Sequence, residues 1–222
     1  MLSKRLQAIY EMLPEVSSVL DVGTDHCLLP MQISKDNSVV EIGASDIAEG
    51  PLQMAANMLE KNKISNVSLY LSDGLVQIPK QYECIVIAGM GAINIIDIFE
   101  KGKDYLKGVK YLLLQCNKND YDLRKWLGTN GYIFLEERIV FDYKYYPIML
   151  VAKGREDYNE YDYIFGPILR KTKSESFCAY WKIEYEKNMR ILRGLSTDNQ
   201  KRFKLQSLCQ QIELELATKN SI

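Results

Sequence analysis

Four short stretches of this sequence combine acids and glycines in a way that could bind a nucleotide-like ligand. They are residues 21–26 (DVGTDH), Asp46, Asp73-Gly74 and residues 88–91 (AGMG). Each stretch follows an apolar run, so each stands where a buried strand would end. A glycine there lets a ligand approach backbone N–H groups, and an acid can accept hydrogen bonds from ribose hydroxyls. A turn with a capping acid would explain any one of them, but four in succession favour a binding site.

The first of these turns distinguishes between cofactors. It contains only Gly23 where dinucleotide-binding proteins carry G-x-G-x-x-G, which disfavours a nicotinamide or flavin cofactor. An acid two residues before this glycine, together with the acid that ends the second strand, favours S-adenosylmethionine. The residues that we predict to bind this cofactor are Asp21, Gly23, Thr24, Asp46, Ile47, Asp73, Gly74, Ala88 and Gly89.

Other polar residues nearby could act on a substrate. His26 is the only histidine of the chain, and its neighbour Asp25 leaves a structural and a functional role equally open. The amides of Gln115 and Asn117 follow another apolar run and could bind the edge of a base, although amides also cap turns. Cys116 has no adjacent histidine and is interpreted as structural. The five cysteines are scattered without a C-x-x-C pair, so neither a disulfide framework nor a zinc site is expected.

Alternating strands and helices are needed to bring these residues together. Apolar runs predict strands that end at Asp21 and Asp46, and further strands at 67–71, 84–87 and 111–115. Helices are expected at 2–13, 29–34, 50–62, 93–99 and 123–127. This alternation is typical of an α/β fold with a parallel sheet covered on both faces, whose ligands lie at the carboxyl ends of the strands. A hairpin formed by 132–141 and 146–152 predicts an antiparallel strand at the end of the sheet.

The last quarter of the chain has a different pattern. Apolar residues keep helical spacing over 177–195 and again over 205–216, after a polar and aromatic connector at 158–166. Gly194 ends the first helix, and residues 197–200 (TDNQ) have the form of a capping box for the second. These features predict an antiparallel helical hairpin. We therefore divide the chain into a cofactor-binding catalytic domain, residues 1–160, and a C-terminal helical hairpin, residues 166–222.

Charge divides the chain at nearly the same place. Residues 1–165 carry 17 Lys/Arg and 23 Asp/Glu, a net charge of −6, whereas residues 166–222 carry 11 and 6, a net charge of +5. The basic side chains could form a solvated face, but their local excess favours contact with the phosphates of a polyanion. The predicted contacts are Arg5, Lys171, Lys182, Arg190, Arg193, Lys201 and Arg202, with Lys4 and the Arg124-Lys125 pair at the rim.

Neither a membrane span nor a secretory signal is predicted. No run reaches the roughly 20 apolar residues that a membrane span requires. Residues 1–7 are too polar to begin a signal peptide. Together with the scattered cysteines, these features favour a cytoplasmic protein, and we expect a monomer that binds no metal.

Seven short blocks of residues fall in an order that resembles a known family. The blocks are 21–26 (DVGTDH) with Leu29-Pro30, 49–51 (EGP), 73–75 (DGL), 87–91 (IAGMG), 114–117 (LQCN), 123–127 (LRKWL) and 165–167 (FGP). They resemble the TrmK family of bacterial tRNA adenine-N1 methyltransferases, which act on adenine 22. The resemblance spans nearly the whole chain, and the first block and the IAGMG block carry it most specifically.

The resemblance implies a Rossmann-like class I methyltransferase with a mostly parallel seven-stranded sheet. It also implies S-adenosylmethionine as methyl donor, and a C-terminal coiled-coil hairpin that helps to hold tRNA. Three positions depart from the family pattern. Asp46 stands where the family usually has Glu, Ala92 replaces a second glycine after Gly91, and Cys116 replaces a proline. The last two departures touch the expected pocket for the target base.

The family reaction assigns roles to the candidate catalytic residues. Adenine N1 has an in-plane lone pair that attacks the sulfonium methyl in line, so the enzyme has to flip and align the base and stabilise the resulting cation. We assign the stabilisation of that cation to Asp25, and we expect His26 to shape the turn or to contact the substrate. Asn117 would bind the Watson–Crick edge, and Met90 with Gly91 would form the wall between cofactor and base.

The same interpretation assigns each part of the cofactor to particular residues. Asp21 and Gly23 would hold the methionine end, Asp46 the ribose and Asp73 the adenine amine. Two alternatives stay open. The chain could be a class I methyltransferase that acts on another RNA or a small molecule, or a non-catalytic, cofactor-sensing module whose hairpin docks a protein.

Overall fold

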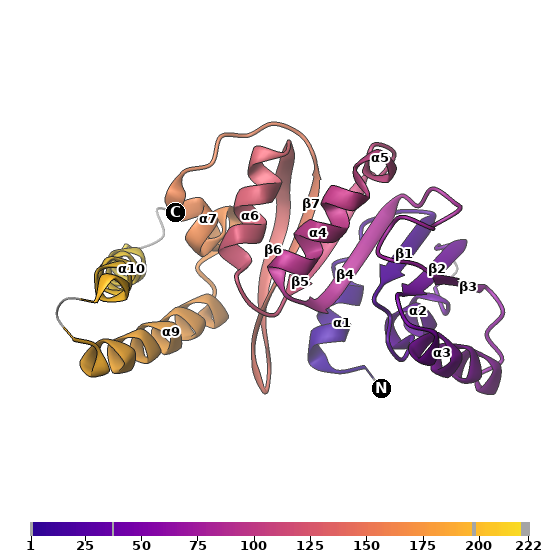
Figure 1. Cartoon of the computed structure of the whole chain (residues 1–222), viewed down its shortest axis with the longest axis horizontal. Coiled ribbons are helices and arrows are strands. Elements are labelled where there is room, and N and C mark those ends of the chain that lie inside the picture. Colours follow the sequence, from indigo (N-terminus) through magenta and orange to yellow (C-terminus); the bar gives the residue numbers. More distant parts are fainter. Residues whose placement is uncertain (1, 37, 197–198, 219–222) are drawn as a thin grey trace.

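The polypeptide folds around one seven-stranded sheet, which crosses the molecule from β3 to β6 (Figure 1). The structure, a computed structural model, describes residues 2–36, 38–196 and 199–218. The strands are β1 (Ser18–Val22), β2 (Glu41–Asp46), β3 (Val67–Leu71), β4 (Cys84–Met90), β5 (Tyr111–Cys116), β6 (Tyr132–Asp142) and β7 (Lys144–Lys153). Their order across the sheet is β3-β2-β1-β4-β5-β7-β6, and the first five are parallel. This confirms the predicted Rossmann-like fold class.

Helices cover both faces of the sheet. They are α1 (Lys4–Glu11), α2 (Leu28–Ile33), α3 (Glu49–Lys61), α4 (Ala92–Lys101), α5 (Lys103–Leu106), α6 (Asp120–Thr129), α7 (Glu160–Phe165), α8 (Pro167–Thr172), α9 (Glu175–Gly194) and α10 (Gln200–Ala217). Successive residues of the central strands enter two different cores. Leu20 and Ile87 pack with α4 and α6, whereas Val19 and Val86 pack with α1 and α2. Because both faces are covered, the strands are continuous apolar runs in the sequence.

The β6–β7 hairpin completes the sheet in a way that the sequence predicted only in part. β7 is antiparallel to β5 and to β6, so the antiparallel strand lies one position inside the edge and β6 forms the edge itself. The turn is tight, because Asp142 pairs with Lys144 and leaves Tyr143 alone between the strands. In Figure 1 this turn extends beyond the other strands, between α1 and α9.

The C-terminal helices pack against the edge strand β6. Ile139 of β6 shares a core with Trp181 of α9 and Ile212 of α10. The two long helices run antiparallel, since Trp181 near the start of α9 packs with the end of α10. At their other ends, Arg202 of α10 donates a hydrogen bond to the carbonyl of Leu192 in α9 at 3.0 Å. Within the described ranges, no helix is long and apolar enough to cross a membrane.

Two local predictions in this region need correction or restriction. Residues 158–166 were expected to form a connector, which was wrong, because they contain α7. Asn159 and Asp162 form a capping box at its start. Six residues are too few to show a helical period. Of the capping box predicted at 197–200, Thr197 and Asp198 lie outside the described residues, and Asn199 is the N-cap of α10.

A buried ion network joins α6, β6 and α8. Arg124 donates from Nε to Glu137 Oε1 at 2.8 Å and from Nη1 to Asp120 Oδ2 at 2.7 Å. Glu137 Oε2 also accepts the backbone N–H of Ile168, in the first turn of α8, at 3.0 Å. Arg124 is only 1% exposed, so its predicted place at an RNA-binding rim was wrong. Its carboxylate partner on β6 holds it inside the protein.

Candidate active site

Two cavities open at the edge of the sheet where β1, β2 and β4 end. The first, named here the acidic cavity, measures about 370 Å³ and lies beyond β2 and β3. Its lining includes Asp46, Ile47, Asp73, Gly74, Asp97, Ile98 and Lys101. The second, named here the Arg5 cavity, measures about 420 Å³ and lies beyond β1 and β4. Its lining includes Arg5, Asp21, Thr24, Asp25, His26, Ala88, Gly89, Asn117, Lys144 and Tyr146.

Gly23 and Met90 line both cavities and form the wall between them. Gly23 has φ of +76°, and a Cβ atom at this position would lie 2.2 Å from the Met90 Cε atom. A side chain here would be strained by the backbone conformation, and the end of the flexible Met90 side chain would have to move to admit it. The turn is fixed to β2, because the N–H groups of Gly23 and Thr24 donate to the Ser45 carbonyl at 2.8 and 3.0 Å. The structure thus brings the β1 turn against the end of β4.

The acidic cavity contains the carboxylates that end β2 and follow β3. Asp46 Oδ1 accepts the backbone N–H of Ala48 at 3.1 Å, which orients this carboxylate at the strand end. Asp73 Oδ2 forms an ion pair with Lys101 Nζ at 3.0 Å, and Lys101 also contacts Asp97 at 2.9 Å. Sequence analysis missed Lys101, because only the packing of α4 beside the end of β3 brings it to this cavity.

Asp21 is a buried carboxylate at the end of β1. Its side chain accepts a hydrogen bond from Thr24 Oγ1 at 2.7 Å, and the residue is 6% exposed. Burial raises the pKa of Asp21 to about 6; the Thr24 hydrogen bond lowers this pKa, and the charge of Asp46 raises it. Near pH 7 the site therefore holds a poorly solvated negative charge, which a ligand with a positive charge would neutralise.

The predicted catalytic residues Asp25, His26 and Asn117 all line the Arg5 cavity. Asp25 and His26 are exposed at its mouth, with 3.6 Å between Oδ2 and Nε2. Asn117 is held firmly, because its Nδ2 donates to the Gly89 carbonyl at 2.6 Å and its backbone N–H to the Met90 carbonyl at 2.7 Å. Of the predicted catalytic residues, Gly91 lies outside both linings and is the N-cap of α4.

Arg5 lies deeper in the site than its predicted role at an RNA-binding surface suggested. Its Nη1 donates to Gln115 Oε1 at 2.7 Å, and its guanidinium lies 5.3 Å from the centre of the Tyr146 ring. Lys144 Nζ lies 4.9 Å from the same ring. Sequence analysis missed Lys144 and Tyr146 as cavity residues. The only signal for them was the cluster of tyrosine and lysine at 143–146 (YKYY).

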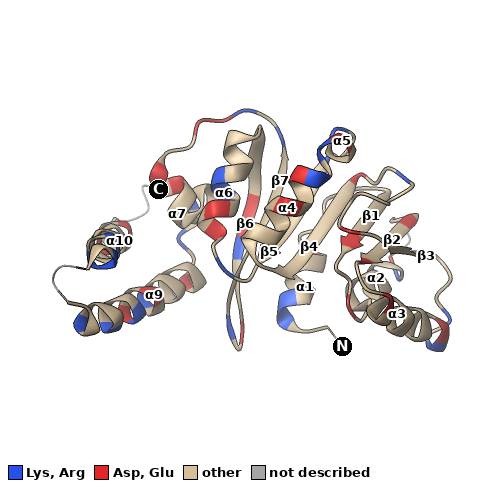
Figure 2. Ribbon diagram, in the orientation of Figure 1, with Lys and Arg blue, Asp and Glu red and all other residues tan. Residues whose placement is uncertain are grey.

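The other predicted RNA-binding residues lie on the C-terminal helices, where Figure 2 shows both basic and acidic segments. None of them lines either cavity. The side chains of Lys171, Lys182, Arg190, Arg193 and Lys201 are exposed. Arg202 is half-buried and donates to the carbonyls of Leu192 and Leu195. These residues are therefore spread along α8 to α10 and are not brought together into one cluster.

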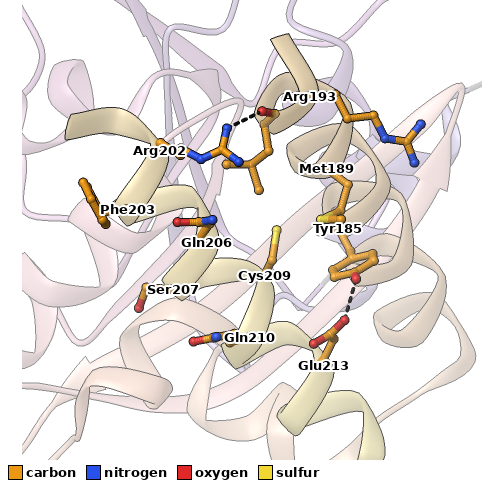
Figure 3. Close-up of a pocket in the computed structure, with 11 residues that line it drawn as sticks. Tyr185, Met189, Arg193, Arg202, Phe203, Gln206, Ser207, Cys209, Gln210 and Glu213 are labelled. Atoms are coloured by element: carbon orange, nitrogen blue, oxygen red, sulfur yellow. Dashed lines mark hydrogen bonds between the residues drawn. The ribbon is translucent and has the colours of Figure 1, made fainter. Parts of the chain in front are cut away.

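A further cavity lies inside the helical hairpin, between α9 and α10 (Figure 3). It measures about 620 Å³ and is lined by Tyr185, Met189, Arg202, Phe203, Cys209 and Glu213 among others. In Figure 3 the Arg193 side chain points away from this groove, and Tyr185 is hydrogen-bonded to Glu213 across it. All the predicted cofactor residues lie elsewhere, so the chemistry is expected at the two cavities of the sheet.

Comparison with known proteins agrees with the geometry. Residues 19–217 match the family model described as tRNA (adenine(22)-N(1))-methyltransferase. A Bacillus subtilis protein of that name is 34% identical over 96% of this chain and 94% of its own length. The crystal structure of the B. subtilis enzyme, 29% identical, has a TM-score of 0.87 and covers 97% of this chain and 99% of its own. A Streptococcus pneumoniae relative crystallised with S-adenosyl-L-methionine is 32% identical with a TM-score of 0.90, covering 97% and 100% of the two chains.

A sheet of this order, with two cavities at the point where the strand order reverses, defines a class I methyltransferase fold. Within that class, the match over nearly the whole length is decisive. The chain belongs to the tRNA (adenine(22)-N(1))-methyltransferase family. The predicted resemblance is therefore confirmed.

Proposed function

We propose that this protein transfers the methyl group of S-adenosylmethionine to N1 of adenine 22 in tRNA. The observation that carries the proposal is the contact of the two cavities at Gly23 and Met90. A donor that lies in the acidic cavity and reaches past Gly23 and Met90 to Asp21 would present its methyl group to a base held in the Arg5 cavity. The activity named for the B. subtilis relative and the cofactor in the S. pneumoniae structure support this proposal.

The residues present fit S-adenosylmethionine. When bound, this cofactor supplies a methyl group on a positively charged sulfur. Asp21 offers a buried negative charge to the ammonium of the methionine end, and Gly23, which has no side chain, leaves space beside it. Asp46, at the end of β2, accepts hydrogen bonds from the ribose hydroxyls, and Asp73 accepts one from the adenine amine. Thr24, Ile47, Gly74, Ala88 and Gly89 complete the contact surface.

The Arg5 cavity would hold the target base. Adenine N1 attacks the methyl carbon through its in-plane lone pair, the carbon–sulfur bond breaks, and the base gains a positive charge. The exposed Asp25 carboxylate stabilises that charge or accepts a proton from N6, with His26 beside it. Asn117, fixed by Gly89, presents its amide to the Watson–Crick edge. Met90, with Gly91 behind it, separates base from cofactor.

Phosphate contacts are assigned to the C-terminal hairpin. Its exposed cations are Lys171, Lys182, Arg190, Arg193 and Lys201, and Arg202 and Arg5 add contacts at the start of α10 and at the cavity. We assign residues 1–160 to catalysis and the coiled-coil hairpin of residues 166–222 to tRNA. A monomer in the cytoplasm, where tRNA is modified, would suffice for this reaction. No cluster of three or more His, Cys, Asp or Glu in the described ranges could hold a metal.

Radiolabelled methyl transfer tests the proposal. The protein, labelled S-adenosylmethionine and a tRNA transcript with adenine at position 22 should give N1-methyladenine in nucleoside analysis. A transcript with guanine at that position should not be labelled. Transfer to both transcripts, or to another nucleoside, would favour the alternative of a methyltransferase with a different target. Binding of the cofactor without any transfer would favour the cofactor-sensing module.

A further inference from the structure

A third cavity lies next to the Arg5 cavity, between the body of the protein and α9. It measures about 580 Å³ and is bounded by the β5–α6 loop, the β6–β7 turn and α9. Asn117 and Lys144 line both this cavity and the Arg5 cavity. The two spaces are therefore neighbours, and a ligand that extends out of the Arg5 cavity past these residues enters the third.

The walls of this cavity present aromatic rings to solvent. Tyr143 is 98% exposed and Phe141 is 51% exposed at the β6–β7 turn. Behind them, the Tyr145 ring lies 5.0 Å from Phe141 and 6.2 Å from Tyr180 of α9. Tyr143 also has φ of +63°, a conformation that asparagine or glycine adopts more easily. The fold itself gives no reason for a fully exposed tyrosine in a left-handed turn.

The same cavity carries uncompensated positive charge. Two acids line it, but each already has a cationic partner, since Asp120 is paired with Arg124 and Glu184 with Lys187. Lys118 and Lys144 also line it, and neither has an ion-pair partner in the part of the chain that the structure describes. The local field therefore favours an anionic ligand.

Exposed aromatic rings beside unpaired lysines are the features with which proteins bind single-stranded nucleic acid, through stacking on the base and contact with the phosphate. We propose that this third cavity holds a nucleotide adjacent to the flipped adenine, with its base stacked on Tyr143 and its phosphate at Lys118 and Lys144. The inference rests on the proposed function, because that function puts the target adenine in the neighbouring Arg5 cavity.

Substitutions at the turn test the stacking contact without disturbing the core. Tyr143→Asn removes the ring and keeps a residue that tolerates the left-handed conformation, whereas Tyr143→Trp keeps an aromatic surface. Lys118→Met removes the charge and keeps the aliphatic chain, and Lys63→Met, at an exposed position on the α3–β3 loop, is its matched control. Calorimetry should give the same S-adenosylmethionine affinity for all four variants and the wild type.

The decisive measurement compares intact tRNA with transcripts that lack the base on one or the other side of adenine 22. With the wild type, one of the two abasic transcripts should raise KM about ten-fold or more. Tyr143→Asn should raise KM for intact tRNA by a similar factor, and the abasic site should then add less than about two-fold. Tyr143→Trp should give the same KM values as the wild type. Lys118→Met should raise KM for every transcript, whereas Lys63→Met should not.

The proposal would be overturned if the effect of Tyr143→Asn on KM were fully additive with the effects of both abasic sites. An unchanged KM for intact tRNA in Tyr143→Asn would overturn it as well. Such results would leave the cavity to another ligand, such as a peptide segment. If the wild type fails to methylate intact tRNA at adenine 22, the proposed function is wrong, which is a different outcome. Methylation of adenine 22 with additive effects rejects only the adjacent-nucleotide site.

Discussion

The buried carboxylate of Asp21 makes the unliganded protein less stable than an amide of the same shape would. Its pKa is raised from 3.8 to about 6 by burial, so between these values the native state binds more protons than the unfolded chain. The free energy of unfolding therefore falls as pH rises from about 4 to about 6. Above pH 6 the free energy of unfolding is lower by the full amount, about 3 kcal/mol.

Asp21→Asn removes this charge and keeps an oxygen that can accept the hydrogen bond from Thr24 Oγ1. We expect the unliganded variant to gain up to about 3 kcal/mol at pH 8, which is about 6–12 °C in Tm for a chain of this size. At pH 4.5 the gain should shrink to about 1 kcal/mol, because the native wild-type carboxyl is then mostly protonated. S-adenosylmethionine should bind the variant at least about ten-fold more weakly, since its ammonium loses a charged partner.

Urea unfolding at the two pH values and calorimetry with S-adenosylmethionine measure these effects. Asp157→Asn, at an exposed position, controls for the loss of one negative charge. An equal gain at both pH values would show that the stabilisation does not come from ionisation. The reasoning would be refuted by a variant that is no more stable than the wild type at pH 8, or by one that binds the cofactor with unchanged affinity.

Three further experiments address other parts of the molecule. Asp25→Ala should lower kcat at least about ten-fold with unchanged cofactor affinity, because the methylated base loses its nearby carboxylate; full activity in single-turnover assays would remove Asp25 from the mechanism. Arg124→Met should destabilise the protein by about 3–5 kcal/mol in urea, because Glu137 is left buried without its cation, and a double variant with Glu137→Gln should recover part of this loss. Lys182→Gln with Arg190→Gln should reduce the slope of log affinity against log salt by about 1 for each phosphate contact that is lost. An unchanged slope would mean that α9 does not contact RNA.

The strand ends of the site could be predicted from the sequence because they depend on local patterns. Buried parallel strands are continuous apolar runs, and the acids and glycines that follow them must lie at one edge of the sheet. Asp21, Gly23, Asp46 and Asp73 all line the cavities as that argument requires. Their roles toward the cofactor stay predictions until the variants are measured.

The residues that sequence analysis missed depend on long-range pairing. Lys144 and Tyr146 reach the Arg5 cavity only because β7 pairs with β5 in one particular antiparallel register. Arg124 and Lys125 are adjacent basic residues on α6 and look equivalent in the sequence. Glu137 lies thirteen positions after Arg124 in the sequence. Only the packing of β6 beneath α6 shows that Glu137 pairs with the buried Arg124, whereas Lys125 stays in solvent.

The network of Arg124 and Glu137 limits how this enzyme can be recombined with its relatives. Glu137 accepts the backbone N–H of Ile168 as well as the guanidinium of Arg124, so one carboxylate anchors the start of the C-terminal helices to α6. A chimera joined near Gly166 would separate the anchor from the helices that it holds. A chimera joined ahead of Asp120 would transfer the whole network, and that junction is the one to use when exchanging RNA-binding arms between species.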